Sequence, residues 1–257
     1  MTSPDVIHLP GSPLKVIRLE ECDSTNNYLK SHLEELKSNF PVLITSVRQT
    51  CGRGRETRIW ISPKGKGLYA SFGLRLQTNQ HVHLLSLIAG ISVIETLKLI
   101  SGKAFTLKWP NDVLFERKKI AGILIENVIS GDTVYCIVGI GINLNHRAED
   151  FPSELVDKAI SLKMVSGISH DYAVEDVSPM VSAALFNWLE KMKQGFQDEI
   201  IQTANALSAS LINGHISFHQ SPDRIIQGIY QGIDHDGGVR IEMESGRIAV
   251  YYSGEIV

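Results

Sequence analysis

The chain has 257 residues, of which 43% are apolar and 21% are charged, and its formal net charge is −3. This composition is typical of a globular protein with enough chain for one large domain, or for a large domain and a small one. The slightly acidic balance argues against a protein that holds nucleic acid through its overall charge.

The first segment, residues 1–13, is polar and carries three prolines. We expect it to be a flexible arm before a strand over residues 14–19. Ser24, Thr25 and Asn26 then precede leucines at helical spacing, a pattern typical of a helix N-cap. The same residues would also turn polar groups toward a ligand at the start of the helix.

The most distinctive stretch, Gln49 to Ser71, combines glycines with cations, and its centre is Gly52-Arg53-Gly54-Arg55. Glycines let a backbone bend or approach a ligand closely, and guanidinium groups suit a phosphate or carboxylate. Trp60 follows, where a purine ring would stack beside phosphate-binding groups. We interpret the stretch as an anion-binding loop, although many loops of this composition are only solvated turns.

A second polar cluster, Lys108-Trp109-Pro110-Asn111-Asp112, follows an apolar helical pattern over residues 84–98 and a short strand. Its proline predicts a turn between two strands, and the turn would present a cation, an amide and a carboxylate together. Such a turn could offer a cation and a metal ligand at one place.

Two later strands are flanked by polar or glycine-rich segments. Lys118 and Lys119 precede a continuous apolar strand, where a terminal lysine is usually solvated. The strand predicted over 135–140 ends in the segment Gly139-Ile140-Gly141-Ile142-Asn143-Leu144-Asn145. We expect its glycines to allow the backbone to approach a ligand.

The last part of the chain changes from helical to β-rich character. A second amphipathic helix is predicted over residues 180–192. Short β-type runs separated by turn signals follow, at 216–218, 225–233, 239–243 and 248–252. These runs favour a small β-barrel.

The cysteines and the hydropathy pattern limit the cellular setting. Cys22, Cys51 and Cys136 lack CxxC spacing, and no basic segment followed by an apolar core opens the chain. We therefore expect a cytoplasmic protein without disulfides or a zinc site. We also expect no apolar run long enough to cross a membrane.

Five motifs in order, STN, GRGR, KWPND, KKIAGIL and GIGINLN, together resemble biotin protein ligases from about Cys22 to Val257. The resemblance implies an α+β fold, with a catalytic domain over 14–207 that has a mixed β-sheet and helices and is related to class II aminoacyl-tRNA synthetases. It also implies an SH3-like β-barrel over 208–257. One departure is Glu56-Thr57, where the family more usually has Arg-Gly.

The activity implied by the resemblance is ATP-dependent formation of biotinyl-5′-AMP with Mg²⁺, followed by transfer of the biotinyl group to a lysine. The acceptor would be a biotin carboxyl carrier protein domain. Some relatives carry an N-terminal DNA-binding domain, for which we expect no room here, and a homodimer is left open.

The resemblance also assigns residues to these roles. The residues expected to bind biotin are Ser24, Thr25, Asn26, Gln49, Gly52, Arg53, Gly54, Arg55 and Lys119. The residues expected to bind ATP are Arg53, Arg55, Trp60, Lys108, Asn111, Asp112 and Asn143. The expected catalytic residues are Arg55, Lys108 and Lys119, with Asp112 as the Mg²⁺ ligand.

Two other functions remain open on the sequence. A lipoate or octanoyl transferase would share the catalytic fold, but those families resemble this sequence less. A non-enzymatic RNA- or anion-binding module would use the arginine loop and the terminal barrel, although the net charge predicts weak binding to nucleic acid.

Overall fold

The computed structural model describes residues 5–8, 14–76, 82–221 and 223–257. They fall into two compact units: unit 1 is Met1–Val82 with Ile120–Pro179, and unit 2 is His83–Lys119 with Met180–Val257. The chain passes between the units within β7 and within α5 as well as after Val82. These boundaries differ from those of the predicted domains, 14–207 and 208–257. The domain division stays a prediction.

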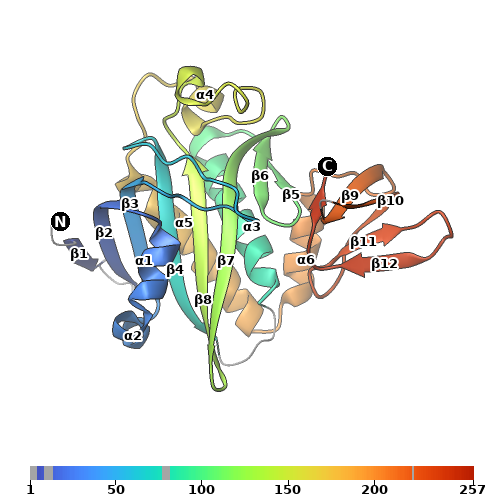
Figure 1. Cartoon of the computed structure of the whole chain (residues 1–257), viewed down its shortest axis with the longest axis horizontal. Helices are drawn as coiled ribbons and strands as arrows, with labels where there is room; N and C mark the ends of the chain where they lie inside the picture. Colours follow the sequence, from blue (N-terminus) through green and yellow to red (C-terminus); the bar gives the residue numbers. More distant parts are fainter. Residues whose placement is uncertain (1–4, 9–13, 77–81, 222) are drawn as a thin grey trace. The chain divides into compact units, whose positions relative to one another are not determined.

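Unit 1 is built on a mixed sheet with strand order β1-β2-β3-β4-β8-β7, and several of its strands are labelled in Figure 1. Its strands are β1 (Asp5–His8), β2 (Lys15–Cys22), β3 (Val42–Gln49), β4 (Gly67–Leu76), β7 (Lys118–Ser130) and β8 (Thr133–Asn143). Strands β2 and β3 are parallel, and the other neighbours are antiparallel. Eight of the ten residues of β4 are buried, as expected for a central strand. The strand β1 lies within the segment expected to be a flexible arm, and the rest of that segment lies outside the described residues.

Short helices complete unit 1. They are α1 (Thr25–Ser31), α2 (Leu33–Leu36), α4 (Leu162–Ser166) and the 3₁₀ turns η1 (Lys37–Asn39) and η2 (Ala148–Asp150). The predicted helix after Ser24 is thus interrupted at His32, between α1 and α2. Figure 1 shows α1 in front of the sheet beside β3 and β4.

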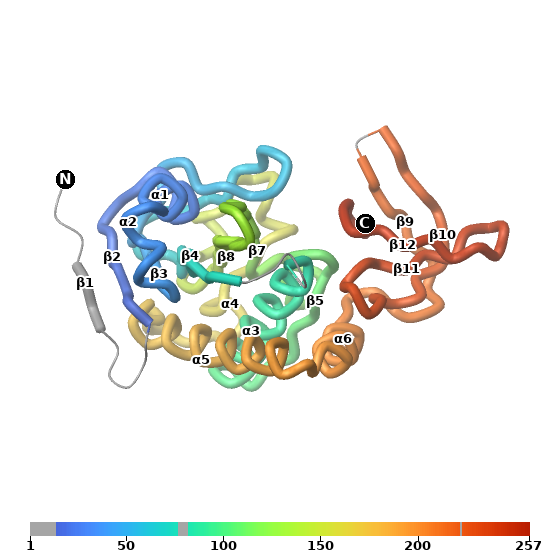
Figure 2. Tube along the Cα trace, turned by 90° about the horizontal axis from the view of Figure 1, so that it is seen from below, coloured from blue at the N-terminus to red at the C-terminus, as the bar shows by residue number. Residues whose placement is uncertain are grey.

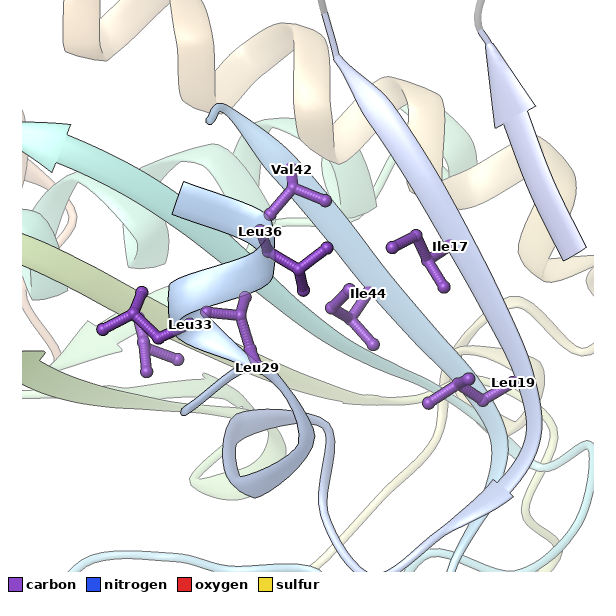
Figure 3. Packing of buried hydrophobic residues seen from close by; sticks show 8 residues of the cluster. Ile17, Leu19, Leu29, Leu33, Leu36, Val42 and Ile44 are labelled. Carbon is purple, nitrogen blue, oxygen red and sulfur yellow. The ribbon is translucent and has the colours of Figure 1, made fainter. Parts of the chain in front are cut away.

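A cluster of aliphatic side chains holds α1 and α2 on the sheet (Figure 3). Its buried members are Ile17, Leu19, Leu29, Leu33, Leu36, Val42, Ile44 and Ile137. Leu29 projects from α1 and has no exposed surface. Burying a leucine of this kind contributes roughly 1.5–3 kcal/mol. The packing therefore fixes the position of α1, and with it the polar residues at its start.

Unit 2 combines helices with a five-stranded antiparallel sheet of order β12-β11-β10-β9-β13. Its elements are α3 (Leu84–Ser101), β5 (Thr106–Lys108), β6 (Asp112–Phe115), most of α5 (Val174–Lys193), α6 (Gln197–Ala206), β9 (His215–Ser221), β10 (Arg224–Ile233), β11 (Val239–Glu242), β12 (Ile248–Tyr251) and β13 (Glu255–Ile256). Figure 2 shows β9 and β10 as a long hairpin. The predicted α+β class, with a mixed sheet and a small C-terminal β domain, is confirmed, and α6 was not predicted.

Helix α3 corrects the expectation that no apolar run in the chain is long enough to cross a membrane. Its 18 residues have a mean hydropathy of 1.8, so it is long and apolar enough to cross a membrane by length and composition. Of that window, 67% is buried inside the protein, which is the pattern of a core helix. The helix ends at Gly102, whose φ of 68° allows its N–H to cap the carbonyl of Lys98.

The packing of α1 predicts a large effect for Leu29→Ala. Loss of this buried side chain should lower the free energy of unfolding by about 2–5 kcal/mol, because the sheet cannot close the cavity. Leu99→Ala is the matched control, since Leu99 is 76% exposed, and its effect should stay within about 0.5 kcal/mol. Urea unfolding of both variants measures the difference, and equal effects would contradict the role given to Leu29.

Candidate active site

The start of α1 lies beside Gln49, which the sequence analysis also assigned to biotin. Gln49 Oε1, at the end of β3, accepts a hydrogen bond from the backbone N–H of Thr25 at 2.8 Å and lies 3.1 Å from Thr25 Oγ1. Gln49 Nε2 donates to Ser62 Oγ at 2.9 Å. Ser24 occupies the N-cap position, but within the described part of the chain its side chain makes no capping hydrogen bond. Ser24 therefore stands at the predicted N-cap position, but its hydroxyl does not cap the helix.

Asn26 is buried against the middle of the sheet. Its Nδ2 donates to the carbonyl of Leu124 at 3.3 Å and to Glu126 Oε2 at 3.0 Å, and its Oδ1 accepts from Ser71 Oγ at 2.6 Å. A Cβ atom at Gly139 of β8 would lie 2.4 Å from Asn26 Oδ1. The glycine is therefore needed for the Asn26 side chain to reach its partners.

Glu126 of β7 is a site residue that the sequence analysis missed. Its side chain is 15% exposed and forms ion pairs with Arg53 at 3.3 Å and Lys30 at 3.4 Å, besides its bond from Asn26. Burial opposes its ionisation, but the hydrogen bond from Asn26 and the charges of Arg53 and Lys30 outweigh burial and lower the pKa of Glu126. The signal in the sequence was a single carboxylate after a continuous apolar strand.

The arginine loop folds back on itself as a short hairpin. Gly54 N–H donates to the carbonyl of Arg58 at 2.7 Å, Trp60 N–H donates to the carbonyl of Gly52 at 2.9 Å, and Arg53 pairs with Ile59. The loop also contacts α1, because Arg53 Nη1 donates to Asn27 Oδ1 at 2.6 Å.

Glu56 and Thr57, the departure from the family pattern, both lie in the left-handed region, with φ of 53° and 66°. This region favours glycine and is costly for a β-branched residue. The tip of the hairpin is therefore strained at the position where the family more usually has glycine.

Three glycines of the segments expected to approach a ligand also make close contacts inside the protein. A Cβ at Gly141 would lie 2.5 Å from the ring of Trp60, so the indole occupies the space beside this glycine. In the same way, Asn26 occupies the space beside Gly139. A Cβ at Gly52 would lie 2.3 Å from the carbonyl oxygen of Trp60. These three glycines are therefore needed for packing within the protein, and their approach to a ligand stays a prediction.

The cations expected to clamp an anion are paired with carboxylates. Besides Arg53, the Arg55 and Arg58 guanidinium groups lie 3.9 and 3.3 Å from Glu56, and Lys66 Nζ lies 2.8 Å from Asp150. An incoming anion would have to compete with these partners.

The remaining predicted residue of unit 1, Asn143, lies at the end of β8 and is buried. Its Nδ2 donates to the carbonyl of Ile160 at 3.1 Å. His146, three residues later, is fully buried and stacks on Phe151 with ring centroids 4.9 Å apart. Burial lowers the pKa of His146 to about 4, so the ring is neutral near neutral pH.

Four predicted residues lie in unit 2: Lys108 ends β5, Asn111 and Asp112 follow at the turn into β6, and Lys119 lies at the start of β7. Lys119 Nζ lies 2.7 Å from Asp112 Oδ1, and Lys108 Nζ lies 3.0 Å from Glu255. Asn111 lies in the turn between them, where its backbone N–H donates to the carbonyl of Lys108. Trp109 Nε1 donates to the carbonyl of Gly237, which anchors the segment to the C-terminal sheet. The structure thus brings Lys119 and Asp112 together as an ion pair.

Asp112, the expected Mg²⁺ ligand, is partly buried beside Lys119. Asp112 has a side chain that is 13% exposed and already pairs with an ammonium group. Among the described residues, no group of three or more His, Cys, Asp and Glu side chains is placed to hold a metal ion. Mg²⁺ commonly needs only one or two carboxylates when substrate phosphates supply the other ligands. The residues present fit an ion that is bound mainly by a nucleotide.

Comparison with known proteins places both ends of the chain in one class. The Biotin/lipoate A/B protein ligase family model matches residues 19–143, and the Biotin protein ligase C terminal domain model matches residues 212–257. The bifunctional ligase/repressor BirA of Bacillus spizizenii is 32% identical over 91% of this chain and 72% of its own length. The biotin--[acetyl-CoA-carboxylase] ligase of Paracoccus denitrificans is 30% identical over 89% of this chain and 95% of its own length.

The solved structures agree with these relatives. The biotin protein ligase from Aquifex aeolicus in complex with biotin and ATP matches with a TM-score of 0.78 and 35% identity, over 94% of this chain and 97% of that chain. The chain belongs to the biotin protein ligase family.

The thiol next to the arginine loop provides a test of the site. Cys51 is exposed, whereas burial raises the pKa of both Cys22 and Cys136 to about 11. Because the thiolate is the reactive form, Cys51 should be alkylated first by iodoacetamide near neutral pH, and biotin with ATP should slow its reaction. Peptide mass spectrometry gives the three rates. Equal rates for the three thiols would contradict the described burial, and unchanged labelling of Cys51 with both ligands would exclude a loop that covers it.

Proposed function

We propose that this protein activates biotin with ATP and transfers the biotinyl group to a lysine of a biotin carboxyl carrier protein domain. In the first step an oxygen of the biotin carboxylate attacks the α-phosphorus of ATP, which forms biotinyl-5′-AMP and releases pyrophosphate. In the second step the lysine amine attacks the acyl carbon, and AMP leaves with the bridging oxygen. The membership of the chain in its family supports this proposal.

The single observation that carries the biotin assignment is the buried polar set in unit 1. Thr25 and Asn26 of α1, Gln49 of β3 and Ser71 of β4 present hydroxyl and amide groups where α1 meets the sheet, and hydrogen bonds among them fix their positions. A buried polar cluster of this kind suits a small polar ring such as the ureido ring of biotin. Ser24 lies beside this set, with a hydroxyl that capping does not use.

The cationic residues are assigned to the two reacting anions, the biotin carboxylate and the ATP phosphates. Arg53, Arg55, Lys108 and Lys119 are proposed to offset the repulsion between carboxylate and phosphate and to stabilise charge on the phosphoryl oxygens. Each of them is paired with a carboxylate in the described structure. The proposal therefore includes an exchange of partners, in which a substrate anion replaces the protein carboxylate.

The nucleotide is assigned to a second set of residues. Trp60 is proposed to contact the purine, and Asn111, Asp112 and Asn143 are proposed to contact the nucleotide. Mg²⁺ would be held mainly by the ATP phosphates with Asp112 as the protein carboxylate, and would neutralise phosphate charge. A cytoplasmic location and a homodimer also remain proposals.

The proposed function is tested by ATP–pyrophosphate exchange. Biotin should stimulate exchange of label from pyrophosphate into ATP, because formation of biotinyl-5′-AMP is reversible. Lipoate should not stimulate it. Exchange that is independent of biotin, or that is driven equally by lipoate, would overturn the proposal, and the second result would favour the lipoate ligase alternative.

The role of Lys119 predicts a loss of activity without a loss of fold. Lys119→Ala removes a partly exposed ammonium group that contributes little to packing, so the melting temperature should change little. The rate of exchange should fall by about 10²–10³-fold, the typical effect of losing one group that stabilises developing charge.

The matched control for this prediction is Lys118→Ala, which removes the neighbouring cation from the other side of β7. This variant should keep most of its activity. Equal rates of exchange in the two folded variants would return Lys119 to the role of a structural partner for Asp112.

A further inference from the structure

The polar set in unit 1 contains a chain of three contacts between four oxygen atoms. Asn26 Oδ1 lies 2.6 Å from Ser71 Oγ, Ser71 Oγ lies 2.7 Å from Thr25 Oγ1, and Thr25 Oγ1 lies 3.1 Å from Gln49 Oε1. All three distances are in the range of a hydrogen bond. Each contact therefore needs one hydrogen atom between its two oxygens.

The two ends of this chain can only accept hydrogen bonds. The Asn26 amide is oriented because its Nδ2 faces two acceptors, the Leu124 carbonyl and the Glu126 carboxylate. The Gln49 amide is oriented because its Oε1 accepts from the Thr25 N–H, while its Nε2 donates to Ser62 Oγ. Reversing either amide would place acceptor against acceptor or donor against donor.

Ser71 and Thr25 supply one hydroxyl hydrogen each, so two hydrogens serve three contacts. The shortest contacts are the costliest to leave without a hydrogen, because lone pairs would face each other at 2.6 or 2.7 Å. Ser71 Oγ–H therefore donates to Asn26 Oδ1, and Thr25 Oγ1–H donates to Ser71 Oγ. The contact without a hydrogen is the longest one, between Thr25 Oγ1 and Gln49 Oε1.

The consequence is that Thr25 Oγ1 and Gln49 Oε1 both present lone pairs at one place. Gln49 is the less buried of the two residues, so the open contact lies at the end of the chain that is nearer to the surface. A donor from outside the protein can satisfy both oxygens, whereas an acceptor would be repelled by both. An N–H group is such a donor.

We propose that Ser71 is a specificity-determining positioning residue, which turns the hydroxyl hydrogen of Thr25 inward so that Thr25 and Gln49 offer acceptors only. Ser71 is fully buried and acts through Thr25. The site then selects a ring N–H over an isosteric ring oxygen. This inference rests on the proposed function, because the ring N–H groups of biotin are the donors that it requires.

The chain also predicts what removal of the Ser71 hydroxyl does. In Ser71→Ala the hydrogen of Thr25 is free to turn to Gln49 Oε1 or to a ligand. The protein then no longer offers two acceptors to the ring N–H of biotin. An analogue with oxygen in place of that N–H can accept a hydrogen bond from Thr25. A site that is merely loosened would weaken both ligands alike.

The experiment measures the dissociation constants of biotin and of the two cyclic carbamate analogues, in which one or the other ring N–H is replaced by oxygen. Calorimetry is performed on the wild type, Ser71→Ala, Ser71→Thr and Ser92→Ala. Ser92 is the matched control, since it is also fully buried but donates to the Ile88 carbonyl in unit 2. The change of melting temperature of each variant reports its structural cost separately.

The wild type should bind biotin more tightly than at least one analogue by tenfold or more. In Ser71→Ala the ratio of the dissociation constant of that analogue to the dissociation constant of biotin should fall by roughly 3- to 10-fold, the worth of one hydrogen bond. Ser71→Thr and Ser92→Ala should keep the wild-type ratio. An unchanged ratio in folded Ser71→Ala overturns the inference. If that variant does not fold, wild-type binding of both analogues as tightly as biotin overturns it. Absence of any biotin binding by the wild type would instead overturn the proposed function.

Discussion

The hydrogen bonds around Asn26 are the constraint on which the rest of unit 1 depends. Asn26 is a buried amide that satisfies three acceptor or donor partners at once, from β4 and β7. A buried amide without partners would cost several kcal/mol, so each partner must be held in place by the fold. The apolar cluster under α1 provides this positioning, because it sets where α1 meets the sheet.

Several features that look independent in the sequence follow from that constraint. Gly139 has no side chain because Asn26 occupies the space, and Ser71 is small and polar because it must reach both Asn26 and Thr25. Glu126 stays ionised despite burial because Asn26, Arg53 and Lys30 surround it. The same carboxylate ties the arginine loop to β7, so the loop and the polar set are linked through one side chain.

Much of the fold could be predicted from local patterns, since the strands, α3 and the C-terminal β runs each carry their own periodicity. The members of the site that lie in motifs, such as Thr25 and Gln49, were predicted for the same reason. Glu126 and Ser71 were missed because their importance comes from partners that are 45 to 100 residues away in the chain. No local pattern reports such contacts.

The charges and glycines show a second limit of sequence reasoning. Lys119 and Arg53 were counted as cations available to a ligand, but each has a carboxylate partner that only the fold brings near. Gly139 and Gly141 were expected to let the backbone approach a ligand, and in the fold they also make space for Asn26 and Trp60. Residue type indicates what a position can do, and the tertiary neighbours decide what it contacts.

We infer that the polar set of unit 1 is already assembled for biotin before ATP binds. Calorimetric titration of the protein with biotin in the absence of ATP tests this claim most directly, with lipoate as the competing ligand. The account predicts saturable binding of biotin without nucleotide and no binding of lipoate at the same concentrations. Binding of lipoate as tight as that of biotin, or no binding of biotin until ATP is added, would contradict it.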